Sequence, residues 1–223
     1  MASSVQPVHP GVFFEPPVTL PRGRHQLPRG QILGAQRERL MIAFTELLAD
    51  RGFARVAVAD VAARAGVSRT AFYEAFADKQ ACAFAAYDRF IDVLLARVRA
   101  ALAADGDVGT VLAAAIGAYF ETLQSDLVVG RAFQVEIDAV GPAARERRRR
   151  SLDRFAAALR SRHQALRERD PLLPDVGHVI FVGLIYAVRQ LASDLLERER
   201  EPRFDALLPE LVPWIVAGFG RPR

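Results

Sequence analysis

Apolar side chains recur every three or four positions from residue 31 onward, and no stretch alternates between apolar and polar residues. Within residues 80–103 a single stripe holds Phe84, Tyr87, Ile91, Leu94, Val98 and Leu102. This spacing matches one face of an α-helix, whereas strict alternation would indicate a half-buried strand. The sequence therefore predicts an all-α fold.

Glycine, proline and aspartate clusters divide this pattern into about nine helices. The predicted helices cover residues 36–51, 58–65, 69–76, 80–103, 108–123, 126–140, 142–168, 176–199 and 204–219. Before them, residues 1–30 hold six prolines and three glycines, so neither a helix nor a ladder can run far there. We expect a flexible, proline-rich basic arm over residues 1–34, a small helical domain over 35–79 and a larger helical domain over 80–223.

The composition excludes several classes of protein. A single cysteine, Cys82, permits neither an intrachain disulfide nor a cysteine-based zinc site. The four histidines lack metal-ligand spacing, and no glycine-rich phosphate loop, HExxH or GxSxG motif occurs. The apolar run over residues 176–188 is too short to span a bilayer. We therefore expect a cytoplasmic protein that is not an enzyme, with no catalytic residues, no metal, no cofactor and no membrane partner.

The basic excess is concentrated near the N-terminus. Residues 1–79 hold ten Lys or Arg against seven Asp or Glu, whereas residues 80–223 hold twenty against nineteen.

The most informative segment is residues 58–76, VADVAARAGVSRTAFYEAF. A helix-turn-helix needs a small residue where its two helices cross, a residue that tolerates positive φ in the turn, and apolar anchors on the second helix. Ala62, Gly66 and the pair Phe72 and Phe76 meet these needs. Ser68 stands where it would cap the second helix.

Over residues 36–87 the sequence closely resembles the TetR/AcrR family of bacterial transcriptional regulators. The shared parts are DRGF at residues 50–53, DVAARAGVSRTAFYEAF at 60–76 and DKQ at 78–80. Beyond residue 87 the resemblance is one of architecture alone. It implies an N-terminal three-helix DNA-binding domain and a C-terminal helical domain for ligand binding and dimerisation.

The resemblance makes residues 69–76 the recognition helix, which enters the major groove. Arg69 would face a base and can bind guanine bidentately, and Thr70 would read a base through its hydroxyl or methyl group. Tyr73 and Lys79 match residues that meet the DNA backbone, and Ser68 would cap, touch phosphate or do both. In the arm, Arg22 and Arg24 would reach a minor groove, or else belong to a tail with non-specific attraction for DNA.

Two positions depart from the family pattern. Ala57 stands where a threonine usually caps the first helix of the motif. The absence of this side-chain cap costs about 1 kcal/mol of stability. Glu74 replaces a histidine or another polar residue; it would accept a hydrogen bond from cytosine or face away from the DNA.

The larger domain carries the remaining expectations. Residues 176–188 are apolar almost all round, which favours burial in a four-helix dimer bundle, although a monomer core would satisfy the same residues. The predicted dimer interface consists of Val179, Phe181, Leu184, Val188, Leu211, Trp214 and Ile215. The predicted ligand pocket is lined by Tyr87, Tyr119, Phe120, Phe133, Glu136, Phe155 and Phe181.

The sequence as a whole predicts a homodimeric repressor that binds a palindromic operator in double-stranded DNA. A small, mostly apolar effector of unknown identity would release it. The alternatives are an activator or a ligand-independent regulator of the same fold, and a helical dimer or adaptor that does not bind DNA.

Overall fold

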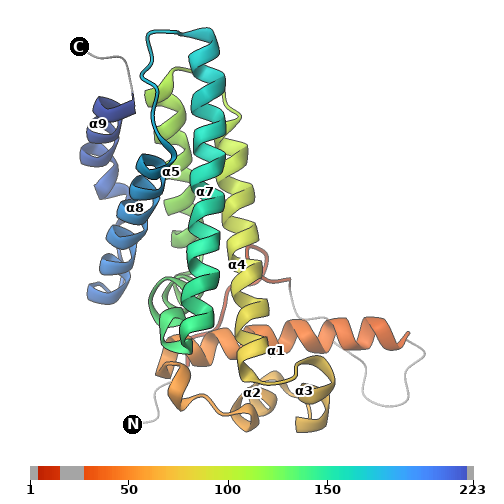
Figure 1. Cartoon of the computed structure of the whole chain (residues 1–223). Helices are drawn as coiled ribbons and strands as arrows, with labels where there is room; N and C mark the ends of the chain where they lie inside the picture. Colours follow the sequence, from red (N-terminus) through yellow and green to blue (C-terminus); the bar gives the residue numbers. More distant parts are fainter. Residues whose placement is uncertain (1–4, 16–27, 220–223) are drawn as a thin grey trace. The chain divides into compact units, whose positions relative to one another are not determined.

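A computed structural model describes residues 5–15 and 28–219 of the chain (Figure 1). Over these residues every regular element is a helix, so the predicted all-α fold is confirmed. The α-helices are α1 (Arg29–Arg51), α2 (Val58–Ala65), α3 (Arg69–Ala75), α4 (Lys79–Leu102), α5 (Val108–Ser125), α6 (Leu127–Gly130), α7 (Pro142–Arg169), α8 (His178–Arg198) and α9 (Leu208–Phe219). Shorter helical turns are η1 (Phe53–Arg55), η2 (Arg131–Val135), η3 (Glu136–Val140) and η4 (Phe204–Leu207).

The chain forms two compact units that do not follow the predicted boundary at residue 79. Among the described residues, the N-terminal unit holds 5–15, 28–90 and 126–144, and the C-terminal unit holds 91–125 and 145–219. The start of α4 belongs to the N-terminal unit, where Tyr87 and Phe90 pack their rings against Phe133 of η2, at centroid distances of 6.0 and 5.4 Å. An aromatic cluster built from separated segments cannot be recognised by helix spacing alone.

In the N-terminal unit, α1 packs against both α2 and α3. Leu40, Phe44 and Leu48 form its buried face. Cys82 is also buried there, and burial raises the pKa of its thiol. The thiol therefore stays protonated at neutral pH and fills the core as an apolar group.

Residues 5–15 differ from the predicted flexible arm. Val8, Phe13 and Phe14 are buried, and the ring of Phe13 lies 5.4 Å from that of Phe90. Proline and glycine exclude regular structure here, but they do not prevent packing. The arm also ends earlier than expected, because α1 begins at Arg29 and not at residue 36.

Side-chain carboxylates accept hydrogen bonds from the backbone N–H groups of this segment, in the place that strand partners would take in a sheet. The Val8 N–H donates to Glu46 Oε1 at 2.9 Å, the His9 N–H to Asp126 Oδ2 at 2.7 Å, and the Glu15 N–H to Glu38. Burial raises the pKa of Asp126, while its bonds from backbone N–H groups oppose that shift. The segment is therefore held to α1 and to the start of α6 by specific hydrogen bonds.

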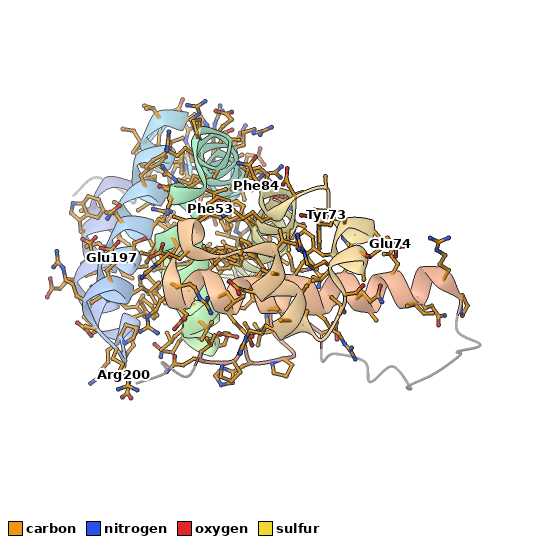
Figure 2. The ribbon with its side chains drawn as sticks, turned by 90° about the horizontal axis from the view of Figure 1, so that it is seen from below. Phe53, Tyr73, Glu74, Phe84, Glu197 and Arg200 are labelled. Carbon is orange, nitrogen blue, oxygen red and sulfur yellow. The ribbon has the colours of Figure 1, made fainter. Side chains whose placement is uncertain are left out.

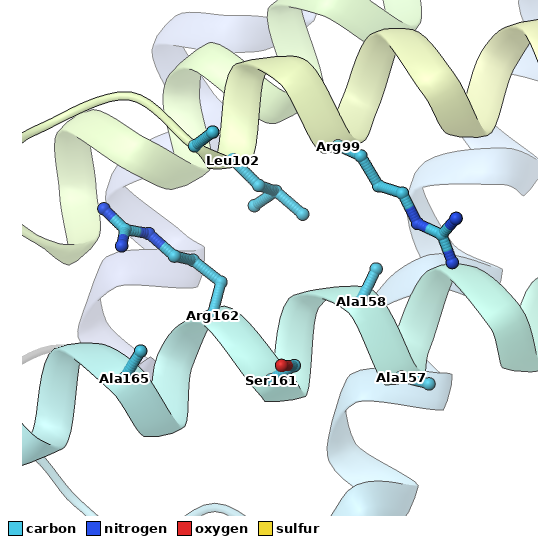
Figure 3. Close-up of a pocket in the computed structure, with 8 residues that line it drawn as sticks. Arg99, Leu102, Ala157, Ala158, Ser161, Arg162 and Ala165 are labelled. Carbon is cyan, nitrogen blue, oxygen red and sulfur yellow. The ribbon is translucent and has the colours of Figure 1, made fainter.

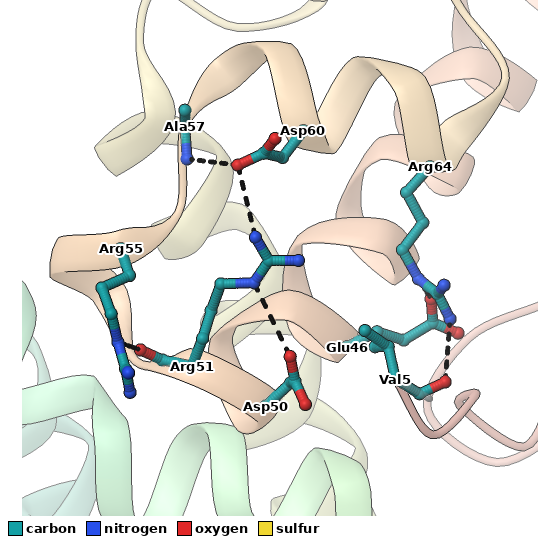
Figure 4. Close-up of polar contacts among 8 residues, drawn as sticks. All are labelled: Val5, Glu46, Asp50, Arg51, Arg55, Ala57, Asp60 and Arg64. Carbon is teal, nitrogen blue, oxygen red and sulfur yellow. Dashed lines mark hydrogen bonds and ion pairs between the residues drawn. The ribbon is translucent and has the colours of Figure 1, made fainter. Parts of the chain in front are cut away.

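Glu46 is buried, with 6% of the residue exposed. Besides Val8 it binds Arg64 of α2, whose guanidinium also donates to the Val5 carbonyl (Figure 4). One carboxylate on α1 thus links the N-terminal segment to the first helix of the helix-turn-helix.

Replacing Glu46 by alanine is expected to lower the free energy of unfolding by about 2 kcal/mol, since a buried N–H and a partly buried guanidinium lose their partner. Urea unfolding followed by circular dichroism measures this change. The exposed Glu121 of α5 provides the control, and Glu121→Ala should stay within about 0.5 kcal/mol of the parent. Equal stability of the two variants would show that Glu46 does not anchor the segment.

The prediction of one helix over residues 126–140 is wrong. Asp126 caps α6 by accepting hydrogen bonds from the N–H groups of Val128 and Val129 at 3.0 and 3.1 Å. The chain then widens into the π-helical turn η2 and tightens into the 3₁₀ turn η3. Gly141, at φ +121°, ends this region.

In the C-terminal unit, α5 packs against α9 and η4. Phe120 stacks on Phe204 at 5.7 Å, and the rings of Phe181, His163 and Phe219 form a second cluster. The predicted single helix over residues 204–219 is divided into η4 and α9. Pro209 lies at the second position of α9, where it breaks no helical hydrogen bond.

Among the described residues, α8 is the one helix long and apolar enough to cross a membrane. From the sequence, the apolar run over residues 176–188 is too short to do so, but α8 extends to Arg198. Phe181, Leu184 and Val188 nevertheless bury one of its faces within the C-terminal unit. Buried core helices can have the same length and apolar composition, so these two properties alone do not indicate a membrane span.

Candidate nucleic-acid interface

The turn between α2 and α3 has the predicted geometry. Gly66 adopts φ 67° and ψ 34°, the left-handed conformation that glycine tolerates without a steric penalty. Its N–H donates to Ala63, and the Val67 N–H donates to the Ala62 carbonyl at 3.0 Å. These bonds close the end of α2 and set the direction in which α3 starts.

The start of α3 is capped as expected. The Ser68 hydroxyl accepts a hydrogen bond from the Ala71 N–H at 3.0 Å. Ala71 and Phe72 face the core of the unit, whereas the predicted DNA-contacting residues of α3 are exposed. These exposed residues are Ser68, Arg69, Thr70 and Tyr73.

Tyr73 is 52% exposed, and its ring meets Phe72 edge-on at 5.5 Å. Glu74 is exposed beside it, and Figure 2 shows both residues on α3. The phenol is therefore supported at its base by a buried ring and remains open to a partner.

The start of α2 lacks a side-chain cap, because Ala57 has no acceptor. The Asp60 carboxylate satisfies the Ala57 N–H at 3.3 Å and also pairs with Arg51 (Figure 4). A capping box is therefore only half present. The third helical residue, Asp60, accepts from the Ala57 N–H, but the Ala57 side chain offers no acceptor in return.

Ala57→Thr is expected to raise the free energy of unfolding by about 1 kcal/mol, because residue 57 already has the extended backbone of an N-cap. Thermal unfolding measures the gain. Ala59→Thr, at an exposed position inside α2, is the matched control and should lower stability because a β-branched residue is unfavourable there. A loss of stability in both variants would contradict the capping argument.

Lys79, which is predicted to meet the DNA backbone, has partners within the chain that the sequence did not indicate. Its ammonium donates to the carbonyls of Phe53 and Val56, each at 3.0 Å, and lies 4.2 Å from the centroid of the Phe53 ring. Two of its three N–H groups therefore hold the segment that leads into α2. The sequence does not reveal which carbonyls come within reach, and the contact of Lys79 with the DNA backbone stays a prediction.

Arg37 of α1 was not singled out from the sequence, yet it contacts the other end of the motif at the Ala75 carbonyl. Glu46 and Arg64 were missed in the same way. In each case the partner is distant in the sequence, and charged residues on a helix surface carry no signal of their partner. Arg22 and Arg24 lie outside the described residues.

The residues predicted to line one ligand pocket fall into different units. Tyr87, Phe133 and Glu136 belong to the N-terminal unit, while Tyr119, Phe120, Phe155 and Phe181 belong to the C-terminal unit. Several of them form the aromatic clusters described above. The structure therefore shows them as packing residues, and their role as a pocket stays a prediction.

Within the C-terminal unit, an open groove of about 480 Å³ lies between α4 and α7 (Figure 3). Arg99 and Arg162 flank a floor of small apolar side chains. None of the predicted pocket residues lines this groove. A second groove on α7 is lined by Arg160, Gln164 and His178 together with Ala157 and Ser161.

The predicted dimer residues separate into two groups. Phe181, Leu184, Val188, Leu211 and Ile215 are buried within a single chain, so the chain's own core already satisfies them. Val179 and Trp214 are 73% and 61% exposed, and the apolar residues Ile180, Tyr186 and Leu191 of α8 are also exposed. On α8 and α9, the large apolar residues that a partner could cover are therefore these five.

Among the described residues, no group of three or more His, Cys, Asp or Glu side chains could hold a metal ion.

Comparison with known proteins identifies the first domain. Residues 43–86 match the family model "Bacterial regulatory proteins, tetR family". The chain is 34% identical over 105 residues to the HTH-type transcriptional activator FasR of Mycolicibacterium smegmatis, covering 47% of this chain and 46% of that protein. It is 35% identical over 119 residues to the HTH-type transcriptional regulator EthR of Mycobacterium tuberculosis, covering 52% and 54%. The matched region thus spans about half the length of these relatives.

Solved structures resemble a larger part of the fold. The regulator FadR of Bacillus subtilis, solved in complex with stearoyl-CoA, has a TM-score of 0.72 at 16% identity over 81% of this chain and 98% of its own. PfmR of Thermus thermophilus, a TetR family transcriptional regulator, has a TM-score of 0.65 at 19% identity over 83% and 97%. Residues 43–86 therefore form a domain of the TetR family of bacterial regulatory proteins, and the larger part of the chain shares the fold of these solved structures.

Proposed function

We propose that this protein is a homodimeric transcriptional regulator that binds a palindromic operator and represses transcription there. The exposed face of α3 carries the proposal. A capped helix presents Arg69, Thr70 and Tyr73 to solvent while its opposite face is fixed in the core. Such a helix fits the major groove, where side chains distinguish base pairs.

Each exposed residue has a role that suits its chemistry. The Arg69 guanidinium donates two parallel hydrogen bonds to a guanine, and the Thr70 side chain reads a neighbouring base. The hydroxyl groups of Ser68 and Tyr73 donate to phosphates, which position the helix without reading sequence. Lys79 contributes to a phosphate contact with the one N–H group that the carbonyls leave. Glu74 adjusts the choice of bases at the edge of the site.

Dimerisation supplies the second recognition helix. The five exposed apolar residues of α8 and α9 form the core of the proposed interface, since large apolar groups in contact with water mark interaction sites. A two-fold dimer matches a palindrome whose half-sites lie about one helical turn apart.

A small, mostly apolar effector completes the proposed mechanism. It binds the DNA-incompetent state more tightly and shifts the population toward that state. The likeness to FadR, which was solved with stearoyl-CoA, supports an apolar effector of this kind. DNA binding places the protein in the cytoplasm.

Activation is the second candidate function, and it is favoured by the likeness to FasR, whose name describes an activator. The same DNA and dimer surfaces would serve either outcome.

Selection of bound fragments from a random pool of double-stranded DNA at physiological salt tests the proposal directly. We expect enrichment of a palindrome. Salt-sensitive binding without enrichment would contradict sequence-specific regulation, and absence of binding would favour the adaptor alternative.

On the selected operator, Arg69→Ala is expected to cost about 1–3 kcal/mol of binding free energy and to relax the preference at one position in each half-site. Fluorescence anisotropy against single-base operator variants measures both effects. Arg97→Ala, which removes an exposed arginine of α4, is the control for net charge and should leave the preference unchanged. An equal loss on every sequence would show that Arg69 contacts only phosphate.

Trp214→Glu is expected to convert the dimer into a monomer at micromolar concentration, because it places a charge in the proposed apolar interface. Analytical ultracentrifugation reports the change. Leu172→Glu alters a residue of similar exposure, 66%, in the loop before α8 and should leave the dimer intact. Identical sedimentation of the parent and both variants would remove this interface from the proposal.

A further inference from the structure

A cation of α1 holds the C-terminal end of the recognition helix. Arg37 Nη1 donates to the carbonyl of Ala75, the last residue of α3, at 2.6 Å. The same guanidinium lies over the ring of Phe76, with its central carbon 4.1 Å from the ring centroid. One planar group thus makes a hydrogen bond through its edge and a cation–π contact through its face.

The end of α3 has an evident need for such a partner. The last carbonyls of a helix have no partner within it, and they carry a partial negative charge. The last turn of α3 contains no basic residue, and the next residue, Phe76, is extended at φ −142°. No glycine in the left-handed conformation closes this end, so the cation comes from another helix.

The length of α3 makes this contact consequential. A helix of seven residues is not stable alone, and its direction depends on what packs against it. Phe76 leads directly to the reading face: its ring lies 5.9 Å from Phe72, and Phe72 lies 5.5 Å from Tyr73. The base-reading Arg69 starts the same helix, about 9 Å from Ala75 along the axis. A tilt at one end therefore displaces the other.

We propose that Arg37 is a positioning residue for sequence recognition, and that it acts through α3 and not through a contact with DNA. The inference rests on the proposed function, in which α3 reads the operator. A bidentate contact to guanine tolerates little displacement, whereas a phosphate contact tolerates much more. Loss of Arg37 should therefore weaken operator binding selectively.

The test measures the affinity of Arg37→Gln for the selected operator and for a random duplex, each over a range of salt concentrations. We expect the ratio of specific to non-specific affinity to fall about tenfold, which is the effect of one mismatched base pair. Non-specific affinity and the salt slope should stay those of the parent, because no phosphate contact is lost. Arg97→Gln, which removes the same charge from α4, should leave the ratio unchanged.

Two further variants separate positioning from general stability. Arg37→Lys keeps a donor for Ala75 but lacks the flat face, so it should recover part of the ratio. Phe76→Leu removes the stacking surface, and its combination with Arg37→Gln should cost less than the sum of the single variants. Thermal unfolding identifies any variant whose lower affinity reflects a smaller folded fraction.

Several results would overturn the proposal. An equal loss on both DNAs with a salt slope lower by about one would identify Arg37 as a phosphate contact. Unchanged affinity, or additive effects of the two substitutions, would remove the coupling through Phe76.

Hydrogen exchange separates failure of this inference from failure of the proposed function. If the parent selects no operator, the proposed function fails, and exchange without DNA then tests the contact. Arg37→Gln should speed exchange at the backbone amides of Ala75 and Phe76 more than at those of α2. Uniform rates across both helices would refute positioning by Arg37.

Discussion

The helix-turn-helix consists of two helices of eight and seven residues, and helices of that length do not persist in water without tertiary contacts. The residues proposed to read DNA therefore depend on the surface that holds α2 and α3. That surface is α1, whose apolar face buries Leu40, Phe44 and Leu48. Polar contacts at its edge then fix direction, because burial of apolar area alone does not specify orientation.

Buried carboxylates extend this support to the N-terminal segment. Glu46 and Asp126 accept hydrogen bonds from the consecutive N–H groups of Val8 and His9. Desolvating a carboxylate is costly, and the raised pKa of Asp126 reflects that cost. Each carboxylate offsets it by accepting from a backbone donor, and the Val8 N–H would otherwise be buried without a partner; Glu46 also binds Arg64. The segment is ordered because its backbone has defined acceptors.

Local signals in the sequence were sufficient for the motif itself. The bounds of α2, the positive φ of Gly66 and the cap by Ser68 all follow from preferences that act over three or four residues. Contacts that span a long separation in the sequence were missed. The packing of Phe13 on Phe90 is one case, and the binding of Lys79 to the Val56 carbonyl is another.

The apolar stripes of the C-terminal unit were ambiguous for a different reason. An apolar side chain buries area equally well in a core, in a dimer interface or against a ligand, so spacing indicates burial without naming the partner. The structure separates these outcomes for single residues. Ile215 is 1% exposed within one chain, whereas Trp214 beside it is 61% exposed. A helical rotation of 100° between neighbours places them on different faces of α9.

Arginine and lysine occupy the two ends of the motif in ways that suit their shapes. Arg37 presents a flat guanidinium that stacks on Phe76 while it donates to the Ala75 carbonyl. Lys79 presents a compact ammonium that can turn toward two carbonyls at once, those of Phe53 and Val56. Because Arg37 belongs to α1 and Lys79 begins α4, the two ends are held by different helices. A displacement of the start of α4 would therefore pull on the entry to α2 and leave the Arg37 contact in place, so it would tilt the motif more than translate it. In the proposed mechanism, a tilt is the change to which base reading by a short helix is most sensitive.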